Sequence, residues 1–177
     1  PPYFVSGGRV GTVSRRPRFR GESRHKVDGK GRVSIPATFR RVLEAGDPDW
    51  SGGENPNFVM VYGNPAYNFI ECYTIAEIER IEDRIDAMEH GDERDALEEI
   101  YSANVVNATV DDTGRIVLPA KLRERFGIGS EAALVASLNT FRIWDAEQYD
   151  AQKQVRSENL KSELPRNPLS LLGKEAQ

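Results

Sequence analysis

The stretch VDGKGRVSIPATFRRVL at residues 27–43 recurs as VDDTGRIVLPAKLRERF at residues 110–126. The two stretches align without gaps, seven of their 17 positions are identical, and several others are apolar in both. Internal similarity at a fixed spacing is the signature of a repeated structural unit. We therefore predict that the chain contains two copies of one unit, 83 residues apart in the sequence.

The local sequence of each copy predicts a turn, a short strand and a short helix. In the D-x-x-G-R segment, aspartate favours the first position of a turn, and Gly31 or Gly114 supplies a positive φ without steric cost. The apolar runs that follow end at Pro36 and Pro119, which cannot donate to a sheet but suit the first turn of a helix. The next residues have a helical pattern that ends at a glycine in both copies.

The similarity continues beyond these helices into a pair of predicted strands in each copy. The four predicted strands are FVMVY (58–62), NFIECY (68–73), AALVAS (132–137) and FRIW (141–144). Turn-forming residues separate the two strands of each pair. A helix start follows each pair: Thr74 with Glu77 forms a capping box, and Asp145 with Gln148 has the same spacing. The duplication thus extends over most of residues 19–150.

These elements predict a mainly β protein with helices, of the α+β class. The helix that begins at Thr74 has one apolar face, formed by Ile78, Ile81, Ile85 and Met88, so we expect a helical linker between the copies. We predict five segments: a basic, disordered N-terminal extension (1–18), a first unit (19–73), the helical linker (74–103), a second unit (104–150) and a polar, partly helical tail (151–177). The tail is expected to fray after its first helical turns.

Charge is distributed unevenly along the chain. The formal net charge is −4, but residues 1–32 carry nine Lys and Arg against two acidic residues, which leaves −11 on the remainder. Such a split between a basic end and an acidic body indicates a polyanionic partner for the basic end. The alternative is a solvated, disordered basic segment.

Several classes of function are disfavoured by what the sequence lacks. Cys72 is the only cysteine and lies among apolar and aromatic residues, so we predict a packing role for it, with no disulfide and no thiolate metal site. His25 and His90 are the only histidines and have no metal-ligand spacing, and no nucleotide-binding or hydrolase motif occurs. No apolar run is long enough to cross a bilayer, and the first 20 residues lack a secretory core. We expect a cytoplasmic protein that is not an enzyme, with no cofactor, bound metal, membrane or small-molecule substrate.

On these residues the chain resembles the MraZ family, within the wider AbrB/SpoVT swapped-hairpin group of DNA-binding proteins. The resemblance rests on FRGES at 19–23, the two D-x-x-G-R turns with their following prolines, and the Trp144-Asp145 helix start, and it covers roughly residues 19–165. It implies two tandem swapped-hairpin β-barrel units related by a pseudo-two-fold axis. It also implies a nucleoid-associated regulator, usually a repressor, of the division and cell-wall gene cluster that binds short direct repeats of double-stranded DNA in its own promoter. Such proteins form ring-shaped homo-oligomers, for example an octamer.

The D-x-x-G-R turns supply the candidate DNA-binding residues. A turn places Arg32 and Arg115 at strand ends, from which a long cationic side chain reaches a phosphate or the O6/N7 edge of guanine. Asp28 and Asp111 accept from the N–H groups of the turn, or pair with the arginine and fix its direction. The predicted residues are Arg32, Lys30, Arg115, Arg24 and Lys26 for DNA contact, and Asp28, Gly31, Asp111 and Gly114 for organising the turns. The alternative is that the Asp–Arg pairs only hold the barrel together.

The two copies differ in the charge around the turn. The first turn is flanked by further cations, whereas the second has acidic and neutral residues at the matching positions. Because phosphate affinity grows with the number of cations that release counterions, we expect Arg32 to contribute more to DNA binding than Arg115. Arg40 is a weaker candidate for DNA contact, and we favour a solvated helix surface for it and for its counterpart Arg123.

A protein-interaction module is the alternative function. Related swapped-hairpin proteins include antitoxins, which bind both DNA and a partner toxin through a tail. The polar tail 151–177 offers LSLL at 169–172 as a short anchor for such a partner. Neighbouring genes distinguish the two functions, because division and cell-wall genes favour the regulator and an adjacent small toxin gene favours the antitoxin.

Overall fold

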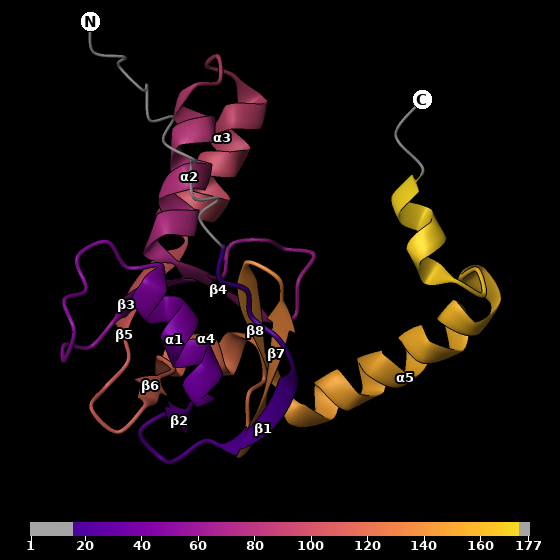
Figure 1. Ribbon diagram of the computed structural model, residues 1–177, viewed down its shortest axis with the longest axis horizontal. Coiled ribbons are helices and arrows are strands. Elements are labelled where there is room, and N and C mark those ends of the chain that lie inside the picture. The colour runs from indigo at the N-terminus through magenta and orange to yellow at the C-terminus, as the bar shows by residue number, and fades with distance from the viewer. Residues whose placement is uncertain (1–15, 174–177) are drawn as a thin grey trace, which may run out of the picture.

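The computed structural model describes residues 16–173 and has the α+β fold that the sequence predicts (Figure 1). Its strands are β1 (Glu22–Lys26), β2 (Arg32–Ser34), β3 (Asn57–Val61), β4 (Ile70–Thr74), β5 (Val105–Thr109), β6 (Arg115–Val117), β7 (Glu131–Ser137) and β8 (Thr140–Asp145). Its helices are α1 (Ala37–Ala45), α2 (Ile75–Asp86), α3 (Asp92–Glu98), the π-helical turn η1 (Glu99–Ala103), α4 (Ala120–Arg125), α5 (Ala146–Glu163) and the 3-10 helix η2 (Pro168–Gly173). Most of the predicted basic extension at 1–18 lies outside the described residues.

The large antiparallel sheet interleaves the two copies of the repeat. Its strand order is β1-β7-β8-β4-β3-β5. β1 of the first copy pairs with β7 of the second, and β5 of the second copy pairs with β3 of the first. This exchange of strands agrees with the swapped, duplicated arrangement that the resemblance implies. We keep 19–73 and 104–150 as the proposed extents of the two copies.

The sheet is open rather than closed into barrels. β1 and β5 form its two edges, because the strands that follow them, β2 and β6, leave the sheet and pair with each other. β2 and β6 form a separate two-stranded ladder in which Val33 lies opposite Ile116. In place of the predicted barrels there is one layered core, with the sheet on one side and the ladder, α1 and α4 on the other.

The main core fills the space between these two layers. Phe39 of α1 meets Phe141 of β8 there, with ring centroids 5.1 Å apart, and Val33 and Ile116 of the ladder are fully buried. Removal of this apolar surface from water drives the two layers together. Cys72 is buried in the same core, and burial raises the pKa of its thiol. This position agrees with the packing role predicted for the cysteine.

A second, smaller cluster covers the other face of the sheet. Ile78 of α2 packs there against Val59 and Tyr73. Thr74 caps α2, since its hydroxyl accepts from the backbone N–H of Glu77 at 3.1 Å, as the predicted capping box requires. α2 and α3 rise together from this side of the molecule, away from the ladder (Figure 1).

α5 leaves the body as a long helix (Figure 1). Asp145 caps it by accepting from the N–H of Gln148 at 3.2 Å, and Ala146 is its one buried residue. The helix continues to Glu163, so the expectation that the tail frays after its first turns is wrong. The cap and the many residues of high helix propensity that follow it account for the difference. Within residues 16–173, no helix combines the length and the apolar character needed to cross a bilayer.

Candidate nucleic-acid interface

The first D-x-x-G-R turn connects β1 to β2 and is organised by one carboxylate. Oδ1 of Asp28 accepts from the backbone N–H groups of Lys30 and Arg32, both at 2.9 Å, and Oδ2 accepts from Nε of Arg32 at 2.6 Å. The N–H of Gly31 donates to the carbonyl of Asp28 at 2.9 Å, and the φ of Gly31 is 80°. Asp28 therefore holds both the shape of the turn and the direction of the arginine.

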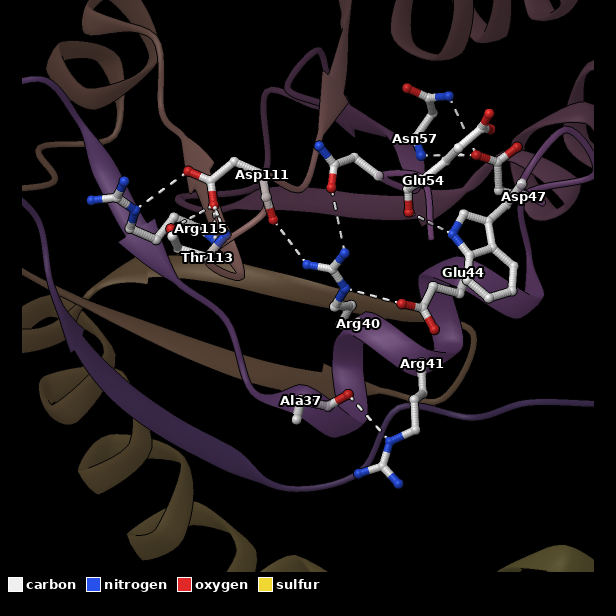
Figure 2. Close-up of polar contacts among 12 residues, drawn as sticks. Ala37, Arg40, Arg41, Glu44, Asp47, Glu54, Asn57, Asp111, Thr113 and Arg115 are labelled. Carbon is white, nitrogen blue, oxygen red and sulfur yellow. Dashed lines mark hydrogen bonds and ion pairs between the residues drawn. The ribbon is translucent and has the colours of Figure 1, made fainter. Parts of the chain in front are cut away.

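The second turn, between β5 and β6, repeats this geometry (Figure 2). Oδ1 of Asp111 accepts from the N–H groups of Thr113 and Arg115, both at 2.9 Å, and Oδ2 accepts from Nε of Arg115 at 3.3 Å. The hydroxyl of Thr113 donates to the same Oδ1 at 2.8 Å. Gly114 has a φ of 77°. The two turns are thus equivalent in backbone and in Asp–Arg pairing.

Hydrogen bonds keep both aspartates charged. The pKa of Asp28 lies below its usual value mainly because the backbone N–H and then the guanidinium of Arg32 stabilise the anion. The pKa of Asp111 falls to about 2, chiefly through the backbone N–H of Arg115, with a further contribution from Thr113. Each aspartate is therefore ionised at neutral pH and acts as an acceptor for its turn.

Arg32 and Arg115 lie on one face of the β2–β6 ladder. In the antiparallel register, Arg32 is opposite Val117 and Ser34 is opposite Arg115. Opposite residues, and residues two apart on one strand, share a face of a sheet, so these four side chains point the same way. Val33 and Ile116, which alternate with these residues along the two strands, are fully buried in the core. The face that carries the two arginines therefore points to solvent.

The terminal nitrogens of both arginines are accessible to a ligand. Within residues 16–173, the only hydrogen bonds from the side chains of Arg32 and Arg115 run from Nε to the aspartates. Their side chains are 37% and 35% exposed. Figure 2 shows the Nη atoms of Arg115 directed away from Asp111. A guanidinium held at Nε presents its two Nη atoms as a preset fork for a phosphate or a guanine edge.

Gly31 and Gly114 differ in their surroundings. A Cβ at Gly31 would lie 2.4 Å from the carbonyl oxygen of Leu118, whereas a Cβ at Gly114 would meet no atom within 4 Å. The N–H of Leu118 also donates to the carbonyl of Gly31 at 2.7 Å. The first turn is therefore packed against the second copy and leaves no room for a side chain at the glycine.

Arg40 of α1 supports the second turn from the first copy. Its Nη1 donates to the carbonyl of Asp111 at 2.8 Å, and its Nε pairs with Glu44 at 3.0 Å (Figure 2). The expectation of a solvated surface is therefore wrong for Arg40, and Arg123 likewise donates from Nε to the carbonyl of Leu118 at 3.1 Å. The contact of Arg40 joins residues 71 positions apart, so no local pattern indicates it.

The remaining predicted contacts lie on β1 or just after it. Lys26 and Lys30 are exposed at the end of the strand and in the turn. Arg24 instead pairs with Asp150 of α5, and its guanidinium lies 6.0 Å from the ring centre of Tyr149. Because α5 holds this arginine, the structure separates Arg24 from the pair of arginines on the ladder.

The sequence prediction omits two residues of the arginine face. Ser34 and Val117 complete the outer face of the ladder, and Val117 is 54% exposed. The signal that indicates their orientation is the alternation along Arg115-Ile116-Val117, because side chains on a strand point alternately to opposite faces. A buried Ile116 therefore places its two neighbours outside.

Comparison with known proteins gives the family of the chain. The family model described as "MraZ protein, putative antitoxin-like" matches residues 18–98 and 103–167. A protein of Ruegeria pomeroyi named "Transcriptional regulator MraZ" is 50% identical over 149 residues, which cover 84% of this chain and 89% of the relative. The matched regions contain both D-x-x-G-R turns and both helices that follow them.

Two further relatives carry the same name. A protein of Cereibacter sphaeroides is 49% identical over 150 residues, covering 80% of this chain and 88% of the relative. A protein of Rickettsia bellii is 32% identical over 142 residues, covering 77% of this chain and 89% of the relative. The similarity spans both copies of the repeat and the helices between them, and the chain therefore belongs to the MraZ family.

Proposed function

We propose that this chain is a sequence-specific, DNA-binding regulator of transcription whose interface is the outer face of the β2–β6 ladder. The observation that carries the proposal is that Arg32 and Arg115, from two copies of the repeat, share one exposed face and are each held through Nε by the aspartate of their turn. A two-stranded antiparallel ribbon fits the major groove of B-DNA. The name of the relatives, a transcriptional regulator, supports the same function.

In this proposed function, the arginines contact the bases and the lysines contact the phosphates. Asp28 and Asp111 already hold Nε of each arginine, so little side-chain freedom is lost when the Nη atoms meet O6 and N7 of guanine. Lys30 in the first turn and Lys26 at the end of β1 supply phosphate contacts that do not depend on sequence. Base choice therefore rests on the arginines, and the salt dependence of affinity rests largely on the lysines.

A single ladder is small for a specific DNA complex, so the protein acts as a ring-shaped homo-oligomer, an octamer for example. Each strand of the ladder has three residues, whereas specific protein–DNA interfaces bury on the order of 1,000 Å² or more. Successive subunits that face the DNA alike suit short direct repeats, and their linkage strengthens a weak contact through effective concentration. A monomeric mass in solution with full DNA affinity would contradict this step.

The proposed target is the promoter of the division and cell-wall gene cluster, the protein's own promoter included, where it acts as a repressor on the nucleoid in the cytoplasm. The test is fluorescence anisotropy with DNA from upstream of its own gene, with a shuffled duplex as control and across a salt series. We expect tight binding that prefers the native fragment and weakens steeply with salt. Equal binding to both duplexes, or no binding at low salt, would rule out the proposed function.

A protein partner for the tail is the second candidate function. Leu169 and Leu172 of η2 are 70% and 80% exposed, and the description of the family includes the words "putative antitoxin-like". Exposed leucines at the end of a polar helix suit a short anchor on another protein. The test is co-expression with the product of a small toxin-like gene next to this one, with and without residues 164–177. Binding that requires these residues supports the function, and the absence of binding contradicts it.

A further inference from the structure

We infer that Val117 reads thymine by contacting its C5-methyl group in the major groove, and so sets part of the sequence preference. The inference rests on the proposed DNA-binding function of the ladder. Val117 lies directly opposite Arg32, and it follows Arg115 by two residues on the same strand. Its side chain is therefore a direct neighbour of both arginines on the outer face, and Ser34 occupies the matching position at the opposite corner.

Val117 differs from the other exposed apolar residues of this fold. Within residues 16–173, the remaining large exposed hydrophobic residues all lie in a turn, in α5 or in the tail: Leu138, Val155, Leu164, Leu169, Leu171 and Leu172. Val117 is the one that belongs to a strand, and the burial of its neighbour Ile116 fixes its outward direction. An exposed valine beside two cations adds nothing to the core. Its surroundings suit a ligand that is anionic and also presents apolar groups.

The major groove of DNA offers that combination. Guanine presents O6 and N7 to an arginine fork, and thymine presents its C5-methyl group to an apolar side chain. The Cβ atoms of opposite residues such as Arg32 and Val117 are about 4.5–5.5 Å apart, and successive bases of one strand are about 3.4 Å apart. A fork and a methyl contact at this spacing fall on neighbouring base pairs. The ladder therefore favours a thymine next to a guanine.

The other half of the ladder provides an internal comparison. In the repeat, Ser34 occupies the position that Val117 has in the second copy, and it lies opposite Arg115. A serine hydroxyl both donates and accepts, so it bonds to several bases or to phosphate. The half formed by Arg32 and Val117 therefore discriminates in favour of thymine, and the half formed by Arg115 and Ser34 tolerates other bases.

Replacement of thymine by deoxyuridine tests the inference, because it removes only the C5-methyl group. Anisotropy compares binding of the full chain to the fragment upstream of its own gene, made with thymine or with deoxyuridine throughout. We expect the wild type to bind the uracil form about fourfold more weakly for each methyl contacted. We expect Val117→Ser to bind both forms alike, near the wild-type affinity for the uracil form. Ser34→Val is the matched comparison at the equivalent position, and it is expected to keep the preference for thymine or to increase it, never to abolish it.

Two results would overturn the inference while leaving DNA recognition in place. The first is a wild type that prefers the native over the shuffled duplex but binds the thymine and uracil forms equally. The second is a thymine preference that persists undiminished in Val117→Ser, which would assign the methyl effect to another residue or to DNA shape. A wild type without any preference for the native duplex would instead contradict the proposed function itself. Circular dichroism and sedimentation check that the variants keep the wild-type fold and mass.

Discussion

Asp28 and Asp111 each use their two carboxylate oxygens differently. One oxygen accepts from backbone N–H groups and fixes the turn, and the other accepts from Nε of the arginine four residues later. Each aspartate therefore links the local path of the chain to the direction of a solvent-facing guanidinium. Removal of the carboxylate disturbs both, whereas removal of the arginine leaves the turn with its backbone hydrogen bonds.

Arg32→Ala is expected to weaken binding to the native fragment by about 1–3 kcal/mol, the usual contribution of a bidentate base contact. Arg115→Ala is expected to have the smaller effect, because the second turn has Thr113 where the first has Lys30. Anisotropy measures both losses, and circular dichroism confirms that the variants are folded. Equal losses in the two variants would contradict the asymmetry between the copies.

The lowered pKa of Asp111 gives its turn a defined acid sensitivity. A carboxylate whose pKa is lower in the folded than in the unfolded state stabilises the fold above the unfolded pKa, and this contribution disappears as the pH falls through the folded pKa. For Asp111 the window runs from the ordinary value of 3.8 down to about 2. Urea unfolding is expected to show wild type more stable than Asp111→Asn at neutral pH, with the difference shrinking across that window. If the difference in stability between the two proteins does not vary with pH, the charge of Asp111 does not contribute to it.

Gly31→Ala is expected to destabilise the protein more than Gly114→Ala. Both substitutions force alanine into the left-handed region, at a cost of about 1–2 kcal/mol. Gly31→Ala also places a Cβ 2.4 Å from the carbonyl oxygen of Leu118, and we expect this overlap to lower the free energy of unfolding by about 1–3 kcal/mol more. Urea unfolding compares the two variants directly. Equal midpoints would mean that the first turn is less tightly packed than the contact indicates.

At the level of elements, β2 and β6 pair across the two copies, and this pairing creates the proposed interface. The repeat, the turns and the helix caps can be predicted from sequence, because each depends on residues a few positions apart. The partner of each strand cannot be predicted in this way, because β1 and β2 have the same local pattern whether they pair within their own copy or with the other copy. Burial of Val33 and Ile116 in one shared core favours the exchanged pairing. The contact between Arg40 and Asp111 escapes prediction for the same reason.

The contact between α5 and β1 is expected to restrain DNA binding. Arg24 pairs with Asp150, and both Lys153 and Tyr149 donate to Glu22 on the same strand. Asp150→Asn removes the competing charge, so Arg24 becomes available to a phosphate. We expect tighter binding and a logarithmic salt dependence that is steeper by about 0.9.

The control for this effect combines Asp150→Asn with Arg24→Ala. The double variant is expected to bind DNA no more tightly than Arg24→Ala alone, because the released cation is then absent. The measurement is anisotropy across the same salt series for all three variants. A gain that persists without Arg24 would mean that Asp150 acts by general repulsion of DNA.

On the scale of the whole molecule, opposite charges occupy different ends. The formal net charge is −4, and residues 75–103 carry 11 Asp and Glu against three Arg. This acidic segment forms α2, α3 and η1, which rise on the side of the sheet away from the ladder (Figure 1). Negative charge there repels a polyanion, and the basic first turn attracts it. An acidic protein can therefore present DNA with one basic face, because the local field governs the approach.

The central claim is that the outer face of the β2–β6 ladder recognises DNA. The most direct measurement compares wild type with the double variant Arg32→Ala, Arg115→Ala by anisotropy on the native and the shuffled duplex at one moderate salt concentration. We expect the double variant to keep its fold and mass, to lose most of the preference for the native duplex, and to bind with little more than the weak affinity that the lysines provide. A double variant that still prefers the native duplex as strongly as wild type would contradict the claim and assign recognition to another surface.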